Sequence, residues 1–524
     1  MADVSDVVQR SMSINEKLHP RLETAAEQNA ILRIGWTNAG DPVPKNGELG
    51  LCPGLPEGAR IRALGKLGSW VAAFGRGGSF TIQGDAEHFL GAGNNGVSIT
   101  CEQFAGNYAG YMMFDGVVKI LEGAGNDAGS SMQGGVLFIR GSAGKRLGGG
   151  MSGGTIIVHG DVADEPGIGM TGGKIIINGR CPQPPEGVKL RPLTDKEIKA
   201  INKDLEDDME VPVDAVCLEV DEHSLVASEH IHSASGDLST IGLVPTENTP
   251  LQSYASIDTV ALLGDEEGVE TIALPLPILP LIQSGDVMKT SDDLSGHLNN
   301  MLSSQPAVVC SNPRPIDLAY ISTYTLEHIV DLLKDVSGFV VDFDSFPSLS
   351  AEEVDGLVVA LRGLSKPNIP MVSIQSLSNV QLQHQRSTYH HFSLALSRLD
   401  DGGGTPYVAS LPIIGRSAKS HLEGTASQAG VLSELALHGH DLAVLIASGM
   451  PIACCTCPVE QTEEIAVWLH DIKNELSQHL RRIGISTIDA LSRAHLRALD
   501  YDTAAMSGLR LSGYERPLPH WFSS

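Results

Sequence analysis

The sequence has few cysteines, no long apolar run and too few basic residues to balance its acids. Eight cysteines in 524 residues are not a disulfide framework, and all but Cys454, Cys455 and Cys457 are scattered. The longest apolar runs fall short of a membrane span. Lys and Arg number 36 against 63 Asp and Glu, a formal net charge of −27. That charge disfavours binding to nucleic acid or to an anionic membrane surface.

The N-terminal residues MADVSDVVQRSMSINEKLHP lack the basic and apolar regions of a signal peptide. With the cysteine pattern, this predicts a cytoplasmic protein. The chain is too long for one ordinary domain, so two or three domains are expected. Its apolar content of 42% is enough for sizeable cores.

Glycine, by contrast, is abundant, at 57 residues of 524. The excess comes from a repeated phrase, seen most clearly as MSGGTIIVHG and then MTGGKIIING. Each unit opens on a glycine corner, continues as a short alternating strand and closes on another glycine. The anchor glycines, spaced 18 to 20 residues apart, are Gly58, Gly78, Gly96, Gly116, Gly135, Gly154 and Gly173.

A period of about nineteen residues is too short for a strand-helix-strand unit but suits one coil of a β-solenoid. Alternation along the strand places Ile156 and Val158 on one face and Ile157 on the other, which predicts an interior of stacked aliphatic side chains. A phosphate-binding loop is the alternative interpretation of the glycines. However, Gly148–Gly150 leads into the strand-like TIIVHG, whereas such a loop needs a following helix.

These repeats, of the form GGxIxIxGxxGxxxGxxM, resemble the GXGXG domain of the glutamate synthase large chain, which also makes up one component of formylmethanofuran dehydrogenase. The resemblance implies a right-handed β-helix over residues 58–182, after an N-terminal extension over 1–57. It implies a structural scaffold rather than a chemical site. The residues over 183–257 are expected to form a tail and linker.

From residue 258 onwards, buried-strand candidates alternate with helical stretches. The strands are VALLG, TIALPLPI, AVVC, FVVDFD and MVSIQSL, and the helices include LEHIVDLLKDV and AEEVDGLVVALRGL. This alternation predicts an α/β barrel or a layered parallel sheet. Polar residues near the expected strand ends, Asp342, Asp344, Ser376, His390 and His391, are candidates for a site or for ordinary caps and surface. Ser350 with Glu353 is typical of a helix capping box.

The segment GHDLAVLIASGMPIACCTCPVE, a long helical stretch and RIGISTIDA resemble the end of the FMN-binding barrel domain of glutamate synthase. The resemblance implies a divergent TIM-barrel-like domain over 258–524. It implies that Gly402, Gly403, Gly404 and Thr405 hold the FMN phosphate, and that Cys454, Cys455 and Cys457 hold a [3Fe–4S] cluster.

Three departures from the family pattern bear on function. The cysteines are spaced C-C-x-C, Pro406 removes a backbone donor from the glycine loop, and Gln375 stands where relatives carry a basic residue near the flavin. A neutral amide does not stabilise developing negative charge as a cation does. Whether the second domain is catalytic therefore stays open at this point.

Three hypotheses of function follow. The first is a glutamate-synthase-like subunit of an amino-nitrogen-transferring oxidoreductase, dependent on FMN, with glutaminase-type and electron-donor subunits as partners. The second is a non-catalytic scaffold or regulatory subunit with a decayed FMN domain. The third is a formylmethanofuran-type subunit of C1 metabolism, which only the glycine repeats favour. We expect the chain to be part of an oligomer or a complex.

Overall fold

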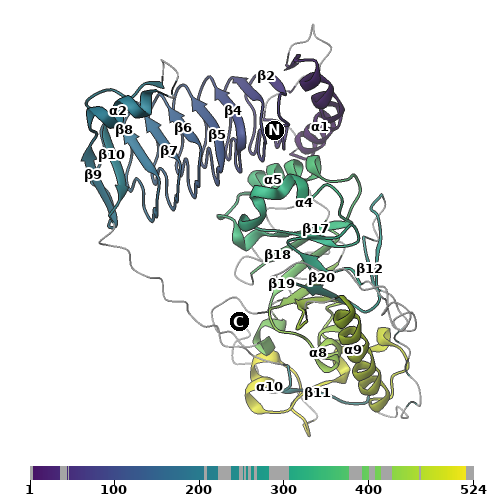
Figure 1. Ribbon diagram of the computed structural model, residues 1–524. Coiled ribbons are helices and arrows are strands. Elements are labelled where there is room, and N and C mark those ends of the chain that lie inside the picture. Colours follow the sequence, from purple (N-terminus) through teal and green to yellow (C-terminus); the bar gives the residue numbers. More distant parts are fainter. Residues whose placement is uncertain are drawn as a thin grey trace. The chain divides into compact units, whose positions relative to one another are not determined.

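The computed structural model describes residues 4–514, apart from 36–43, 45–46, 204, 206–208, 222–237, 247–251, 253–254, 256, 258–260, 265–267, 283–305, 377–391, 400–406, 413, 415–427 and 460–461. The chain divides into two compact units, drawn in Figure 1. The first is Met1–Ser228 together with Leu326–Val330 and Leu349–Ser365, and the second comprises the remaining residues.

Eight parallel strands in sequence order run through the first unit (Figure 1). They are β1 (Ile31–Ile34), β2 (Arg60–Leu64), β3 (Ser79–Gln83), β4 (Asn95–Cys101), β5 (Asp115–Ile120), β6 (Val136–Ile139), β7 (Thr155–Val158) and β8 (Lys174–Ile177). From β2 onwards the register advances by nineteen residues per strand, so that Ile61 lies beside Phe80 and Ile156 beside Ile175. This register confirms the predicted period. We call residues 31–177 the coil stack.

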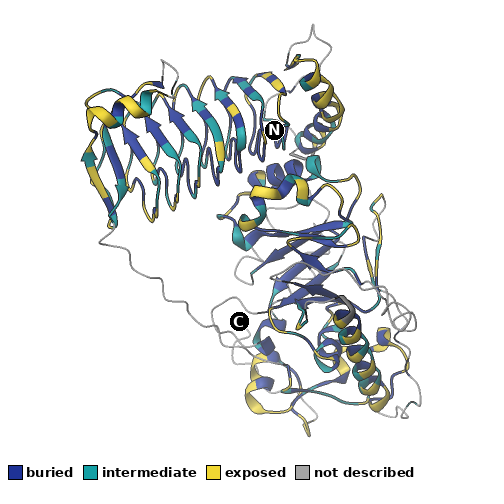
Figure 2. Cartoon of the chain, in the orientation of Figure 1, coloured by how far each residue is buried: buried dark blue, intermediate teal, exposed yellow. Residues whose placement is uncertain are grey.

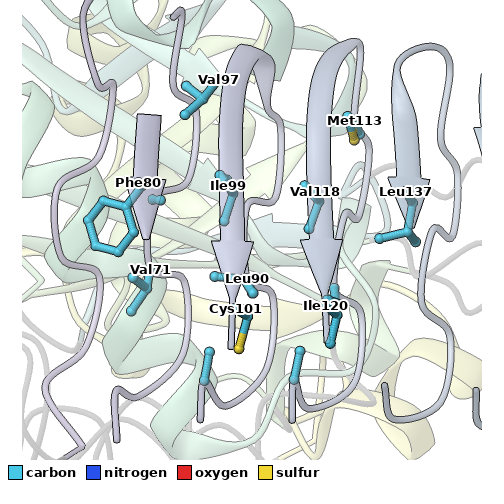
Figure 3. Close-up of a cluster of buried hydrophobic side chains, with 14 of the residues drawn as sticks. Val71, Phe80, Leu90, Val97, Ile99, Cys101, Met113, Val118, Ile120 and Leu137 are labelled. Atoms are coloured by element: carbon cyan, nitrogen blue, oxygen red, sulfur yellow. The ribbon is translucent and has the colours of Figure 1, made fainter. Parts of the chain in front are cut away.

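The interior of the coil stack is a set of columns of apolar side chains, one from each coil. Figure 3 shows Phe80, Ile99, Val118 and Leu137 following one another in this way. Ile156 and Val158 continue the interior, whereas Ile157 belongs to a separate cluster on the outer face. The predicted division of faces is therefore confirmed, because alternate side chains of a strand point to opposite sides.

A second ladder holds the coils together away from the strands. Single parallel bridges join residues that are nineteen apart, running through Leu67, Ala86, Ala105, Ala124, Ala143 and Val162. The corners before the strands need left-handed backbone, and the anchor glycine Gly154 has a φ of +79°. A side chain there would also meet the Gly134 carbonyl of the preceding coil. Both constraints explain why glycine recurs at this position.

Helices and a hairpin cover parts of the coil stack. Helix α1 (Val4–Glu27) places Leu18 and Leu22 in the same core as the first strands. After β8 the chain forms β9 (Val188–Pro192), α2 (Asp195–Asn202) and β10 (Val216–Val220), with β10 antiparallel to both β8 and β9. Helix α5 (Ala351–Leu364) also belongs to this unit. Strand β1 and helix α1 thus lie within the range that the sequence suggested as an extension.

The second unit contains a closed barrel of eight strands. They are β14 (Ile278–Leu281), β15 (Val309–Cys310), β16 (Leu318–Ile321), β17 (Gly338–Asp342), β18 (Met371–Gln375), β19 (Leu394–Arg398), β20 (Ala429–Ser433) and β21 (Ile452–Thr456). Every neighbouring pair is parallel, including β14 with β21, which closes the barrel. Of the two architectures that strand-helix alternation allowed, the structure is the barrel.

Aliphatic side chains fill the barrel, and its strands are dark blue in Figure 2. Leu279, Val340 and Leu396 belong to the interior cluster, which also takes in Leu263 and Leu274. The last two come from an antiparallel hairpin, β12 (Ala261–Leu263) with β13 (Ile272–Leu274), which precedes the first barrel strand. The interior is thus a packed core rather than a channel.

The remaining elements are short, apart from one helix. They are β11 (Ile241–Leu243), β22 (Leu496–Ala498), α4 (Ile329–Leu332), α8 (Gly439–Ala447), α9 (Thr462–Arg482), α10 (Tyr501–Ser507) and the 3-10 turns η3 (Thr323–His328), η4 (Phe343–Ser345), η5 (Ile488–Ala490) and η6 (Arg493–His495). The sequence predicts one helix over residues 326–336. In the structure this segment contains only the end of the 3-10 turn η3 and the four-residue helix α4. Among the described residues, none of the helices has the length and apolar character needed to span a bilayer.

Candidate active site

The carboxyl ends of the eight parallel strands meet at one end of the barrel, which we call the mouth. In barrels of this kind the functional groups gather at that end. Three polar side chains occupy interior positions there, each two residues beyond an aliphatic member of the interior cluster. They are Tyr320 on β16, Asp342 on β17 and Arg398 on β19.

Arg398 is the centre of an ion network at the mouth. Its Nη2 donates to Asp342 Oδ2 at 2.7 Å, and its Nε donates to Asp344 Oδ2 at 3.0 Å. Its Nη1 donates to Glu434 Oε1 at 2.9 Å. The side chain of Asp342 is only 5% exposed, whereas that of Glu434 is 48% exposed. One guanidinium therefore faces three carboxylates, and the set has a formal net charge of −2.

Asp342 is also bound by its neighbours on β16 and η4. The Tyr320 hydroxyl donates to Oδ2, and the Asp344 backbone N–H donates to Oδ1 at 3.2 Å. Burial, followed by the negative charge of Asp342, raises the pKa of Tyr320 above its ordinary value. Tyr320 is therefore a neutral hydrogen-bond donor at physiological pH.

Arg398 remains a cation in this environment. Its burial acts to lower the pKa of the guanidinium, but the charge and hydrogen bond of Asp342 act in the opposite direction, and the pKa is raised overall. Arginine is in any case protonated at all pH values of interest. The network thus joins β16, β17, β19 and the residue after β20 through charge-assisted hydrogen bonds.

Within the described part of the chain, the Thr456 hydroxyl at the mouth is a buried polar group without a hydrogen-bond partner. Thr456 ends β21 two residues after Cys454, which belongs to the interior cluster, so its side chain starts on the interior face. Its Oγ1 is buried and has no hydrogen-bond partner within the described part of the chain. A buried hydroxyl of this kind is where a bound molecule would find a donor or acceptor.

The structure brings together only part of the candidate set. Asp342 and Asp344 meet at Arg398, and both also serve the turn η4, whose cap is Asp342. Ser376 directly follows β18. His390 and His391 lie outside the described residues. Ser350 and Glu353 form the predicted capping box, with the Ser350 N–H donating to Glu353 Oε2 at 2.6 Å.

The cation of the mouth lies on a different strand from the one that the sequence suggested. Gln375 is adjacent to Ile374, a member of the interior cluster, so its side chain starts on the outer face of the barrel. Among the described residues, the cation at the mouth is Arg398, one strand further on. The signal was present in LALSR, where leucines at alternate positions are followed by a single arginine.

The proposed phosphate loop, Gly402 to Thr405, lies outside the described residues. In the sequence these residues come shortly after β19, which ends at Arg398. The chain therefore leaves the barrel at the mouth, four residues before Gly402.

The three clustered cysteines are not brought together as a ligand set in the described part of the chain. Cys454 belongs to the barrel interior, whereas Cys455 packs outside with the cluster that includes α8 and α9. Among the described residues, no group of three His, Cys, Asp or Glu side chains could hold a metal ion. Adjacent residues of a strand cannot face one cluster, so these thiols do not fit [3Fe–4S].

Helix α8 follows β20, so its N-terminus is another place where a phosphate could bind. Its first N–H groups already have carboxylate partners. The Gly439 N–H donates to Glu475 Oε2 at 3.0 Å, and the His438 N–H donates to Asp441 Oδ2 at 3.0 Å. These two carboxylates take the place that an anionic ligand would have at the helix N-terminus.

Comparison with known proteins gives weak structural matches only. No family model matches the chain, and no curated protein matches it. A variant of flavocytochrome b2 with sulfite bound is 13% identical, covering 54% of this chain and 84% of its own, with a TM-score of 0.34. The flavin-binding domain of baker's yeast flavocytochrome b2 has the same identity and coverage and a TM-score of 0.29. The monotopic membrane protein (S)-mandelate dehydrogenase is 11% identical, covering 49% of this chain and 88% of its own, at 0.29.

Proposed function

We propose that this chain is a subunit of a glutamate-synthase-type oxidoreductase that transfers amino nitrogen, with an FMN-binding barrel and a structural β-helix. What carries the proposal is one observation. A closed parallel barrel with polar groups at its mouth shares the chain with a nineteen-residue coil stack. Each part agrees with one of the two family resemblances in the sequence. We further propose that the coil stack is right-handed and of the GXGXG type.

The residues proposed to hold FMN are those of the mouth and its loop. Backbone N–H groups of Gly402, Gly403 and Gly404 would bind the phosphate, with the Thr405 hydroxyl beside them. Thr456 Oγ1, which lacks a partner within the described chain, would bind a polar edge of the ligand. When bound, FMN supplies electron or hydride transfer. The chain itself positions the ligand and excludes water from the packed barrel below it.

Two substrates of such a reaction would come from outside this chain. We propose that a glutaminase-type subunit delivers ammonia and that an electron-donor subunit delivers reductant. The barrel mouth would then be the place where a 2-imino acid receives electrons.

The test is the flavin content of the purified full-length chain. We expect a yellow protein whose FMN absorbance is near stoichiometric after incubation with free FMN and gel filtration. Gly403→Asp should lose the flavin, because the new carboxylate repels the phosphate. Gly268→Asp, in the β12–β13 connection, is the matched control and should keep it. Thermal melts of both variants check that the fold is intact.

A non-catalytic scaffold is the second candidate, and the charge of the mouth favours it. Arg398 is engaged by three carboxylates, and Glu475 occupies the N-terminus of α8. Both features lower the positive potential that an FMN phosphate needs. Protein that stays colourless and binds no added FMN would reject the flavin proposal and favour this candidate.

A further inference from the structure

Three arginines lie side by side on the outer face of the first two coil strands. Arg33 is on β1, and Arg60 and Arg62 are on β2. The parallel register places Arg33 beside Arg62 and Ile31 beside Arg60. All three arginines are exposed, because the alternate residues of both strands point into the core.

These arginines lack acidic partners among the described residues. The only bond they form there joins Arg60 Nη1 to the Asn29 side-chain oxygen at 3.2 Å. Several other cations on the coil stack do have acidic partners, such as Arg146 with Asp127 at 2.6 Å and Lys66 with Glu87 at 2.5 Å. Like charges on neighbouring strands cost stability. Three adjacent arginines without a described carboxylate partner are therefore unexpected in a chain with a formal net charge of −27.

The same face also exposes apolar side chains. Ile31 is 37% exposed and Leu64 is 41% exposed, and alternation along β1 and β2 puts both on the arginine side. We call Ile31, Arg33, Arg60, Arg62 and Leu64 the arginine face. Its mixture of guanidinium groups and aliphatic side chains is typical of protein interfaces, in which arginine is enriched. A site for a bare inorganic anion would not need the aliphatic residues.

The outer face of the sheet already accepts a covering segment at its other end. There Phe138, Ile157 and Ile176 are buried under residues of α2 and the segment after it, including Ile198 and Met209. At β1 and β2, the corresponding outward side chains are exposed. The sheet thus offers a second, uncovered stretch, and its charge is opposite to that of the chain as a whole.

We propose that the arginine face binds an acidic segment of a partner protein. Carboxylates of the segment pair with Arg33 and Arg62, whose guanidinium forks match carboxylate geometry. Apolar side chains of the segment pack on Ile31 and Leu64. Charge complementarity carries the assignment, and binding also relieves the repulsion between adjacent arginines. The proposal does not depend on whether the barrel holds FMN.

The test measures binding of a defined acidic peptide to the full-length chain. The probe is a fluorescein-labelled synthetic peptide of repeated Glu-Glu-Leu, and the readout is fluorescence anisotropy at low and at physiological salt. We expect saturable binding that weakens as salt rises. The double variant Arg33→Glu with Arg62→Glu should bind at least about tenfold more weakly, a loss of one or more ion pairs at a desolvated interface.

The matched control is Arg180→Glu, since Arg180 is 92% exposed on the same unit. It should bind like the wild type, and melting curves should show all variants folded. Leu64→Ser should also weaken binding. The proposal is overturned if the peptide does not bind. It is also overturned if Arg180→Glu weakens binding as much as the Arg33→Glu, Arg62→Glu double variant does. It is also overturned if equimolar inorganic phosphate displaces the peptide, since the face is then only an anion site.

Discussion

Arg398 is the centre of the ion network that the described residues form at the barrel mouth. It is a single cation on a buried strand, and three carboxylates reach it, two from the end of β17 and the adjoining turn η4 and one from the residue after β20. Removing one partner of a buried pair leaves the other charge desolvated and unpaired, whereas removing an exposed partner costs little. The ion pairs of the three carboxylates therefore contribute differently to stability, because Asp342 is nearly buried and Glu434 is half-exposed.

We expect Arg398→Met to destabilise the chain by about 3–5 kcal/mol, because Asp342 is left buried without its cation. Glu434→Gln, the control at the exposed side of the same guanidinium, should cost at most about 1 kcal/mol. Urea unfolding of both variants measures the difference. If both variants lose the same free energy of unfolding, the buried Arg398–Asp342 pair is no more important to stability than the exposed Arg398–Glu434 pair.

Three aromatic residues at equivalent positions of successive coils depart from the rule that positive φ values belong to glycine. Positive φ was expected at glycines, yet Trp70, Phe89 and Tyr108 have φ values of 61°, 60° and 59°. Their rings stack, with centroids 4.4 Å and 4.7 Å apart. The backbone N–H of each also donates to the next coil, as Trp70 does to the His88 carbonyl at 2.9 Å. Cross-coil contacts hold a backbone conformation that these residues rarely adopt alone.

At the scale of the elements, the coil stack depends on close approach between successive corners. The Gly154 backbone has a φ of +79°, and a Cβ there would lie 2.8 Å from the Gly134 carbonyl oxygen. Neither the conformation nor the contact can relax without moving the neighbouring coil. Each coil buries its apolar face only against its neighbours, so a local displacement affects the interior columns.

We therefore expect Gly154→Val to cost about 2–5 kcal/mol, combining left-handed strain with overpacking. Gly187→Val is the control, because Gly187 has a similar φ of +84° but no atoms within 4 Å of an added Cβ. It should cost clearly less in the same denaturant titration. If Gly154→Val unfolds at the wild-type midpoint, the corner is not constrained as described.

At the scale of the whole molecule, charge is the dominant feature that composition alone reveals. A formal net charge of −27 makes the folded state repel itself, and dissolved salt screens that repulsion. The two compact units share this excess of acids, and the arginine face is a local exception to it.

We expect the melting temperature to rise by several degrees when potassium chloride is raised from low to roughly 1 M, where the Debye length falls to about 3 Å. Differential scanning calorimetry measures the shift. The same salt series should weaken peptide binding at the arginine face. A melting temperature that is flat or falls with salt would show that self-repulsion is not a significant cost.

The sequence by itself determined the coil period, the division of strand faces and the capping of α5. These are local properties, because each is read from residues within about one coil or one helical turn. The sequence alone could also have predicted that Cys454 and Cys455 do not face the same site, since neighbouring residues on a strand point to opposite sides.

Only the tertiary structure decided between a barrel and a layered sheet, because that choice depends on β14 pairing with β21, more than 150 residues away. It also decided the mouth, where Tyr320, Asp342, Arg398 and Glu434 come from four segments of the chain. No local pattern links these positions. They meet because the closed parallel barrel brings the carboxyl ends of its strands to one place.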